Sequence, residues 1–173
     1  AENRGVKIAI ENCPMLFTED EWPGGKNLAI SPAIWRELFK RLPSDMLGLN
    51  FDPSHFIWQE MDYIKPLYEF KDKIFHVHYK DIKVNRDARN EVGILATPLS
   101  YMLPCIPGHG DVDWAEYIRA LLEIGYKGAA CIEIEDKSFE NDKESIENSL
   151  KISRQYLKQF INFPEKGKKY EKD

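Results

Sequence analysis

Four short apolar segments, each followed by a stretch with helical spacing, most limit how this chain can fold. The strand-like segments are about residues 6–11, 47–52, 74–79 and 129–135. The helix-type patterns lie near residues 31–42, 60–70, 113–125 and 145–161. A strict alternation of strand and helix predicts a parallel sheet covered by helices. We therefore expect an α/β protein built from four βα units, as found in a TIM (β/α)8 barrel.

Local signals predict where two of the helices begin. Ser31 followed by Pro32 is typical of a helix start, and Asp113 and Glu116 have the spacing of a capping box. Helical spacing also predicts which side chains are buried in the last two helices. They are Trp114, Ile118, Leu121 and Leu122 in one, and Ile146, Leu150, Leu157 and Phe160 in the other.

The two faces of these segments carry different kinds of side chain. Successive residues of a strand point to opposite faces. One face is large and apolar: Ile8, Ile10, Leu49, Phe51, Phe75, Val77, Ile132 and Ile134. The other face is small or polar, which fits a barrel interior better than an open sheet covered on both sides. The sequence also contains no G-x-G-x-x-G motif after a strand and no P-loop, so nucleotide-binding folds are disfavoured.

Four parallel strands cannot close a barrel, because closure requires a consistent strand number and stagger. The chain also begins at Ala1, shortly before a core-type strand, and lacks an initiator methionine. We therefore expect a fragment, or a barrel whose other half is missing. The open side is expected to contact either that missing half or a second copy of the chain, giving a homo-oligomer.

Composition narrows the function classes. A chain of 173 residues fits one domain, and its net charge of -5 argues against a nucleic-acid partner. No apolar run approaches the roughly 18 residues of a membrane span, and no signal-peptide pattern opens the chain. Cys13, Cys105 and Cys131 are odd in number and widely spaced, which favours free thiols over disulfides. We expect a cytoplasmic protein with a small-molecule substrate.

The polar face ends each strand on a candidate metal ligand. These four residues are Glu11, Asp52, His78 and Glu133. Three carboxylates and one imidazole suit a single divalent ion, with Mn²⁺, Mg²⁺, Co²⁺ and Zn²⁺ all open. Each residue alone has a plainer interpretation as a helix cap or ion-pair partner, but recurrence in all four units favours a site. The metal would acidify a C–H next to a substrate oxygen, and Glu11 and Glu133 would remove and return the proton.

Four further residues are candidates for substrate contact. His55, three residues after Asp52, could bond a sugar hydroxyl or serve as a loop histidine. Lys80 could contact a substrate oxygen or form a solvated pair with its neighbour. His109 lies in a long loop, and such loops are often functional. Arg86 could bind phosphate, although arginines in a charged loop are usually solvated.

Other side chains near these positions have packing interpretations. His76 shares a face with His78, one step deeper, and is expected to support it or to pack. Trp22 and Trp58 either line a pocket or pack in the core, and packing is favoured for Trp58.

Several stretches resemble a known family. They are Ile-Glu-Asn at 10–12, Asn-Phe-Asp-Pro-Ser-His at 50–55, Phe-His-Val-His-Tyr-Lys-Asp at 75–81, Pro-Gly-His-Gly-Asp-Val-Asp-Trp at 107–114 and Cys-Ile-Glu-Ile-Glu-Asp at 131–136. The chain is similar to the sugar phosphate isomerase/epimerase family, which has a xylose isomerase-like barrel. The resemblance implies that residues 1–163 are the C-terminal half of that barrel, strands five to eight. Residues 164–173 would form a charged, mobile tail.

The resemblance also implies an activity. It points to a divalent-metal-dependent isomerase or epimerase of a sugar or sugar phosphate, with Glu11, Asp52, His78 and Glu133 as ligands, the two glutamates as acid–base pair, and His55 on the substrate. Epimerases of that family carry an arginine shortly after the metal histidine, whereas here Arg86 is displaced. The alternatives are a metal-dependent dehydratase or lyase acting on an inosose or a 3-keto-glycoside, and a non-catalytic sugar-binding barrel. DNA repair endonucleases of this scaffold carry three metals and more histidines than the four here.

Overall fold

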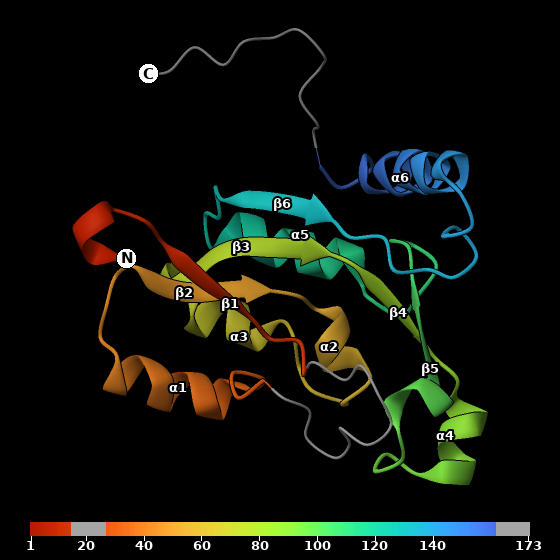
Figure 1. The fold of residues 1–173 in the computed structure, drawn as a ribbon, viewed down its shortest axis with the longest axis horizontal. Helices are drawn as coiled ribbons and strands as arrows, with labels where there is room; N and C mark the ends of the chain where they lie inside the picture. The colour runs from red at the N-terminus through yellow and green to blue at the C-terminus, as the bar shows by residue number, and fades with distance from the viewer. Residues whose placement is uncertain (15–26, 162–173) are drawn as a thin grey trace, which may run out of the picture.

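A computed structural model describes residues 1–14 and 27–161 (Figure 1). Trp22 and the predicted tail at 164–173 lie outside these residues. The described part forms one four-stranded parallel sheet in the order β1-β2-β3-β6. Its strands are β1 (Ile8–Glu11), β2 (Leu47–Phe51), β3 (Ile74–Tyr79) and β6 (Ala129–Ile132). This confirms the predicted α/β class and the four parallel strands.

Helices cover one face of the curved sheet (Figure 1). They are α1 (Pro32–Arg41), α3 (Lys65–Glu69), α5 (Trp114–Glu123) and α6 (Lys143–Leu157). The main core lies between this face and the helices, where Trp35 of α1 and Tyr117 of α5 pack with Phe51 of β2. In the described ranges, no helix combines the length and the apolar character needed to cross a membrane.

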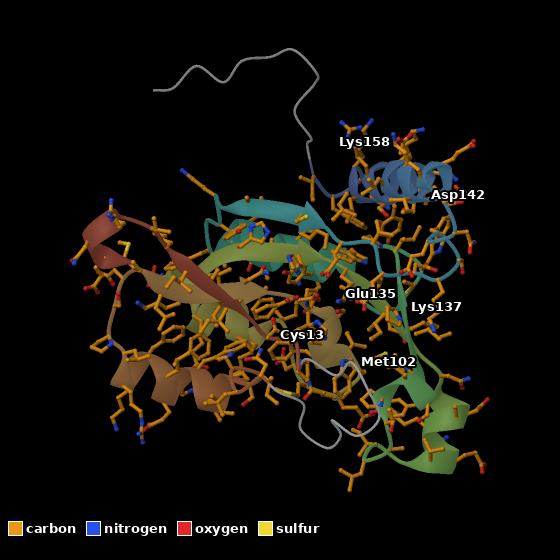
Figure 2. All side chains as sticks on the ribbon, viewed as in Figure 1. Cys13, Met102, Glu135, Lys137, Asp142 and Lys158 are labelled. Atoms are coloured by element: carbon orange, nitrogen blue, oxygen red, sulfur yellow. The ribbon has the colours of Figure 1, made fainter. Side chains whose placement is uncertain are left out.

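Local sequence signals set the helix starts. Asp113 caps α5 by accepting a hydrogen bond from the backbone N–H of Glu116, which confirms the predicted capping position. Asp142 caps α6 in the same way, accepting from Ser145, and Figure 2 labels it at the start of that helix. Ser31 precedes Pro32 as predicted, with Pro32 in the first helical turn, but its side chain makes no capping hydrogen bond.

The long loop predicted after the third strand is structured instead. It contains β4 (Asp81–Val84) and β5 (Met102–Cys105), which pair antiparallel as a separate sheet. Between them lie α4 (Arg86–Val92) and a short 3-10 helix, Pro98–Ser100. Each strand has four residues, and the two are far apart in the sequence. No short turn motif joins them, so no local signal in the sequence indicates that they pair.

The predicted helix at 60–70 is two shorter helices. α2 is Ser54–Ile57, and α3 begins only at Lys65. Glu60, between them, has φ of 56°, a left-handed conformation that interrupts helix geometry. Pro66 then fits the first turn of α3, where a missing N–H costs nothing.

The predicted face of Phe75 is wrong because β3 contains an irregularity. Register shifts between Leu49 and Asn50, whose partners are Ile74 and His76, so Phe75 is the extra residue. Its ring lies against Gly48, where an added Cβ would stand 2.6 Å from the ring carbons. Gly48 is thus required by close approach rather than by turn geometry.

The predicted buried face of the last helix is also wrong in part. Ile146 and Leu150 are 39% and 40% exposed, whereas Ser149, Ser153 and Leu157 are buried. Both serine hydroxyls bond carbonyls of their own helix, which satisfies them without a larger side chain. In α5 likewise, one residue of the predicted face is exposed: Leu122, at 69%.

Candidate metal centre and adjoining pocket

Four side chains from the four βα units meet at the C-terminal end of the sheet. One potential ligand atom from each of Glu11, Asp52, His78 and Glu133 lies within 4.8 Å of the others. Glu11 ends β1, Asp52 follows β2, His78 belongs to β3, and Glu133 follows β6. Parallel strands place all four at the same rim, so the predicted convergence is present. We call these four residues the quartet.

The imidazole of His78 lies among the carboxylates. Its Nδ1 is 3.0 Å from Oε1 of Glu11 and 2.9 Å from Oε2 of Glu133. Oδ2 of Asp52 is 3.9 Å from the same nitrogen. One nitrogen and three carboxylate oxygens therefore face a common centre.

The proximity of these groups shifts their pKa values in opposite directions. Burial lowers the pKa of His78, but hydrogen bonds to Glu11 and Glu133 outweigh it and raise that pKa to about 10. Burial raises the pKa of Glu11, but hydrogen bonds to His55 and His78 outweigh it, leaving the pKa well below its usual range. The His78 hydrogen bond likewise lowers the pKa of Glu133. Without a metal, His78 carries a proton held between two carboxylates.

The donor set fits a divalent cation. Oδ2 of Asp52 is completely buried, yet it accepts no hydrogen bond from any described residue. The nearest nitrogens, of His55, Lys80 and His78, are 3.5 to 3.9 Å away, beyond hydrogen-bond distance. A buried carboxylate oxygen that accepts no hydrogen bond is costly unless cations surround it, and a metal ion in the quartet would contact it directly. Three carboxylates and one imidazole supply the oxygen and nitrogen ligands that Mn²⁺, Mg²⁺, Co²⁺ or Zn²⁺ accept. The residues present therefore fit the metal.

Asn12 fixes the backbone of Asp52. Its Nδ2 donates to the Asp52 carbonyl at 2.8 Å, and its Oδ1 accepts from the Asp52 N–H at 2.8 Å. Oδ1 of Asp52 accepts from the N–H of Ser54, so only Oδ2 is left to face the quartet. Sequence reasoning gave Asn12 no role; its place directly after Glu11, at the end of a strand, was the available signal.

Asn50 holds the other side of His78. Its Nδ2 lies 3.1 Å from Nε2 of His78, while its Oδ1 is buried and has no partner among the described residues. The ring of His76 stands edge-on to that of His78, with centroids 5.5 Å apart. Burial lowers the pKa of His76, which keeps it neutral beside its charged neighbour. His76 thus packs against His78, as expected.

His55 and Lys80 lie directly beside the quartet. Nε2 of His55 is 3.5 Å from Oδ2 of Asp52 and 3.8 Å from Oε1 of Glu11. Nζ of Lys80 is 2.7 Å from Oε2 of Glu135 and 3.6 Å from the same Asp52 oxygen. Burial lowers the pKa of Lys80, but Asp52 and Glu135 outweigh it and raise that pKa. Lys80 is therefore a buried cation rather than a solvated one.

His109 and Arg86 lie apart from this cluster. His109 is exposed, and its ring is tilted against that of Phe139, with ring centroids 6.3 Å apart. Arg86 is exposed at the start of α4 and lines a separate hollow with Asp111. The structure brings neither residue to the quartet, and any role of theirs in substrate binding stays a prediction.

The loop that carries His109 is organised by Asp81. The buried carboxylate accepts hydrogen bonds from the N–H groups of Gly108 and Val112 and from Nε1 of Trp114. A Cβ on Gly110 would overlap with this carboxylate. Close approach to Asp81 therefore explains Gly110, whereas Gly108 has a φ of 94° and lies against the ring of Tyr156. Sequence reasoning did not assign these structural roles.

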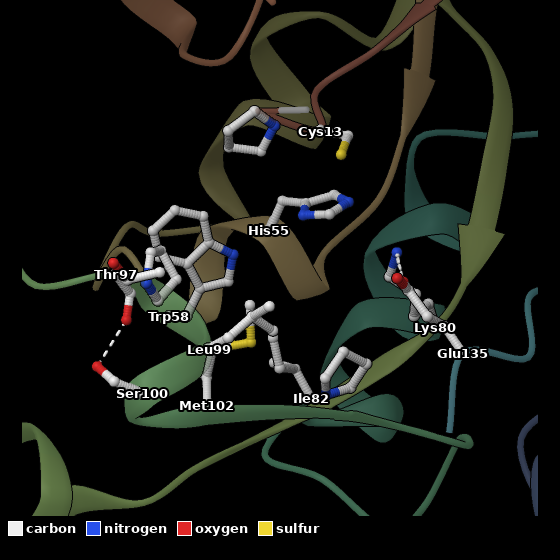
Figure 3. A pocket seen from close by; sticks show the side chains of 13 residues that line it. Cys13, His55, Trp58, Lys80, Ile82, Thr97, Leu99, Ser100, Met102 and Glu135 are labelled. Carbon is white, nitrogen blue, oxygen red and sulfur yellow. Dashed lines mark hydrogen bonds and ion pairs between the residues drawn. The ribbon is translucent and has the colours of Figure 1, made fainter. Parts of the chain in front are cut away.

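A pocket of about 380 Å³ adjoins the quartet (Figure 3). His55 lies on one side of it, and Lys80 with Glu135 lies on the opposite side. Figure 2 shows Cys13 and Glu135 at the same end of the sheet, with Met102 of β5 beyond them. The paired strands β4 and β5 and the short 3-10 helix between them, Pro98–Ser100, supply most of the remaining lining. The structured excursion after β3 thus forms one wall of the pocket.

Comparison with known proteins identifies the family of the chain. A family model described as xylose isomerase-like TIM barrel matches residues 1–158. The chain belongs to this family. An inosose dehydratase of Lactiplantibacillus plantarum is 29% identical over 119 residues, which cover 67% of the chain and 38% of that protein.

Solved structures agree with the xylose isomerase-like fold. A zinc-bound IolI protein superimposes with a TM-score of 0.66 at 22% identity, covering 94% of this chain and 53% of IolI. A D-psicose 3-epimerase of Clostridium cellulolyticum H10, solved with D-tagatose, gives a TM-score of 0.63 at 16% identity, covering 92% of this chain and 50% of the epimerase. The chain thus spans about half the length of these structures and less of the curated relative. The resemblance predicted from the sequence motifs is confirmed at the level of this family.

Proposed function

We propose that this chain provides the metal-binding and acid–base residues of a sugar isomerase or epimerase. The observation that carries the proposal is the convergence of Glu11, Asp52, His78 and Glu133, within 4.8 Å, at one rim of the sheet. A D-psicose 3-epimerase with the same fold supports the reaction class. The sugar, and the identity of the metal, stay open.

The two glutamates are the proposed acid–base pair. A divalent ion bound by the quartet supplies Lewis acidity at a substrate carbonyl or hydroxyl, which acidifies the neighbouring C–H. Glu11 and Glu133 approach His78 from different βα units, and the hydrogen bonds to His78 hold the pKa of each below its usual range, so both are ionised. Return of the proton to the opposite face of the same carbon gives an epimer, and return to the adjacent carbon gives an isomer.

His55 and Lys80 are the proposed substrate contacts. Both line the pocket as well as bordering the quartet. Sugar hydroxyls are good partners for an imidazole and an ammonium group, because both can donate hydrogen bonds. These two residues would hold the substrate so that its reacting carbon lies between the glutamates.

A dehydratase is the second candidate. Curated relatives include several inosose dehydratases. Dehydration begins with the same proton abstraction and then needs an acid to protonate the departing hydroxyl. The glutamate that took the proton can return it to that hydroxyl, and Lys80, a buried cation 3.6 Å from Oε2 of Glu133, is placed to donate a hydrogen bond to the same oxygen.

A panel of ketoses, inososes and 3-keto-glycosides separates these candidates. The full-length protein that contains this chain is loaded with Mn²⁺ or Zn²⁺, and products are followed by mass spectrometry and NMR in D₂O. An isomerase or epimerase yields a product of unchanged composition that carries solvent deuterium at the deprotonated carbon. A dehydratase yields a product that has lost water. Turnover without deuterium in any product would contradict proton abstraction by the glutamates.

Metal analysis tests the non-catalytic alternative. We expect about one divalent ion per purified chain, lost when Asp52→Asn removes the fully buried carboxylate charge. Glu147→Gln, on an exposed turn of α6, is the matched control and keeps the metal. A protein that binds sugar with no metal would favour the sugar-binding barrel instead.

A further inference from the structure

The pocket beside the quartet has one polar side and one apolar side. His55, Lys80 and Glu135 form the polar side, nearest to the quartet. Trp58, Ile82, Pro98, Leu99, Met102 and Pro104 form the apolar side. A ligand whose reacting carbon lies at the quartet and whose hydroxyls face His55 must place its remaining part against this apolar side.

The apolar side is built into the fold. Trp58 and Ile82 are 3% and 1% exposed, and they belong to one hydrophobic cluster against which Met102 packs. Trp58 follows α2, whereas Ile82 and Met102 come from the paired strands β4 and β5. Residues held by both a core cluster and a strand ladder form a preformed surface, which lowers the entropy cost of binding.

The charges of the pocket disfavour a phosphate. Among the described lining residues, Lys80 is the one permanently charged cation, and Glu135 is 2.7 Å from its Nζ. Glu135 therefore already pairs with this cation, and one oxygen each of Asp52 and Glu133 lies 3.6 Å from the same nitrogen. Phosphate sites in proteins use arginine forks or clustered backbone N–H groups. Arg86 lines a separate hollow that also holds Asp111.

We propose that the pocket receives an uncharged apolar substituent, an alkyl or aryl group carried by the sugar, and rejects a phosphate. This inference rests on the proposed function, because it takes the quartet as the reacting end. A volume of about 380 Å³ lies in the range of small-ligand pockets, about 300–1,000 Å³, and accommodates an aryl ring beside a sugar. The substituent packs against Trp58, Leu99 and Met102 while the hydroxyls face His55 and Lys80.

Binding to the metal-loaded full-length protein tests the inference without needing turnover. The probes are phenyl β-D-glucopyranoside, methyl β-D-glucopyranoside and D-glucose 6-phosphate, measured by calorimetry. We expect the phenyl glycoside to bind at least about tenfold more tightly than the methyl glycoside, because the ring buries apolar surface. We expect the phosphate ester to bind most weakly. In protein labelled with ¹³C-methyl methionine, the Met102 signal should shift with the phenyl probe alone.

Two truncations locate the subsite. Leu99→Ala, at a side chain that is 57% exposed, removes wall contacts with little risk to folding, and Met102→Ala removes a deeper one. Each is expected to lower the affinity for the phenyl glycoside severalfold to about tenfold and to leave the methyl glycoside unchanged. Leu103→Ala is the matched control, since Leu103 neighbours Met102 on β5 but is 61% exposed and does not line the pocket.

The outcomes separate the two proposals. Equal binding of the phenyl and methyl glycosides, or tightest binding of the phosphate ester, would overturn the apolar subsite even in an active isomerase. Phenyl preference that is lost in Leu99→Ala and kept in Leu103→Ala would support it. The same preference in a protein that turns over no ketose, inosose or 3-keto-glycoside would contradict the proposed function alone.

Discussion

At the scale of single residues, two asparagines place the candidate ligands. Asn12 bridges the end of β1 to Asp52 through two hydrogen bonds, and Asn50 contacts the ring nitrogen of His78 that faces away from the carboxylates. Neither side chain is charged or itself a ligand. Supporting hydrogen bonds of this kind orient metal ligands, and losing one typically lowers metal affinity by about 10–100-fold.

Asn12→Ala is expected to destabilise the protein and to weaken metal binding. It leaves the N–H and C=O of Asp52 without their partners in a buried position, a loss of about 1–3 kcal/mol in the free energy of unfolding. Thermal unfolding and metal titration measure the two effects. Asn85→Ala removes the exposed cap of α4 and should lower stability without changing metal affinity. Equal metal affinity in both variants would contradict a positioning role for Asn12.

Asn50→Ala is expected to weaken metal binding about 10–100-fold, the usual range for losing such a supporting partner. When Nδ1 of His78 binds a metal, Nε2 carries the proton and needs an acceptor. A half-turn of the Asn50 amide presents Oδ1, which is buried and otherwise unpartnered. Competition with a fluorescent chelator measures the change. Asn50→Asp retains an acceptor oxygen and should keep a higher metal affinity than Asn50→Ala. The reverse order would contradict the role of Asn50 as a hydrogen-bond acceptor for His78.

Metal affinity is expected to rise with pH through the neutral range. The metal-free site raises the pKa of His78 to about 10, so the proton that the metal must displace is fully bound below that pH. Affinity should therefore fall as pH falls, by about tenfold per unit for one displaced proton. Calorimetry in buffers of different ionisation enthalpy counts the protons released. Affinity that is flat between about pH 7 and 9 would show that His78 is neutral before the metal arrives.

Glu133→Gln is expected to lower turnover by at least about 10²–10⁴-fold in the complete enzyme, the usual contribution of a general base, and to weaken metal binding as well. His55→Ala should mainly raise KM, because His55 lies beside the quartet without belonging to it. Steady-state kinetics at saturating metal separate the two patterns. A fully active Glu133→Gln enzyme would require a different base.

At the scale of elements, local patterns predicted more than long-range pairing did. The four parallel strands, the cap at Asp113 and the candidate ligand at each strand end follow from period-two alternation and nearest-neighbour chemistry. The hairpin β4–β5 did not, because its partners meet only after α4 and a short helix intervene. The predicted buried face of α6 was wrong in part because the hydroxyls of Ser149 and Ser153 donate to carbonyls of their own helix, which lets these polar residues be buried. Composition does not reveal such bonds.

The candidate site divides in the same way. The quartet was predictable, since strand-end positions of parallel units share one rim. The pocket was not, because its apolar wall depends on the unpredicted hairpin. The solvated pair of Lys80 and Asp81, left open as the alternative to a substrate contact of Lys80, is absent because both side chains are buried. Sequence alone cannot show that the Asp81 carboxylate lies under the loop that follows it.

Gly110→Ala is expected to destabilise the loop that covers Asp81. The added methyl group overlaps with that carboxylate, and overpacking of this kind costs about 1–3 kcal/mol. Chemical denaturation measures the loss. His109→Ala, at the exposed neighbouring position, should leave stability within about 0.5 kcal/mol of the parent. A neutral Gly110→Ala would mean that the loop is not held as described.

At the scale of the whole molecule, the described residues form a curved sheet with two edge strands, β1 and β6. Residues beside the β1 edge expose apolar surface: Val6 at 57% and Ile8 at 50%. Unpaired backbone groups beside such side chains invite further strands. The solved structures that the chain matches are about twice as long as this chain.

A polypeptide restricted to residues 1–173 is therefore expected to self-associate. The edges of β1 and β6 can pair between copies, and exposed Ile8 adds apolar contact. Light scattering after gel filtration measures the mass in solution. Ile8→Lys should reduce association, because a charge on an edge strand opposes pairing. A sharply melting monomer at micromolar concentration would contradict the prediction.

The quartet draws one residue from each βα unit, and its outermost members, Glu11 and Glu133, come from opposite edges of the sheet. An ion bound by all four residues would therefore link the first strand of the sheet to the last. No truncation that removes a single unit could bind it equally well. Metal affinity thus depends on the assembled sheet as well as on the four side chains. A variant with a weak spectroscopic metal signal could have lost either a ligand or the packing of the sheet.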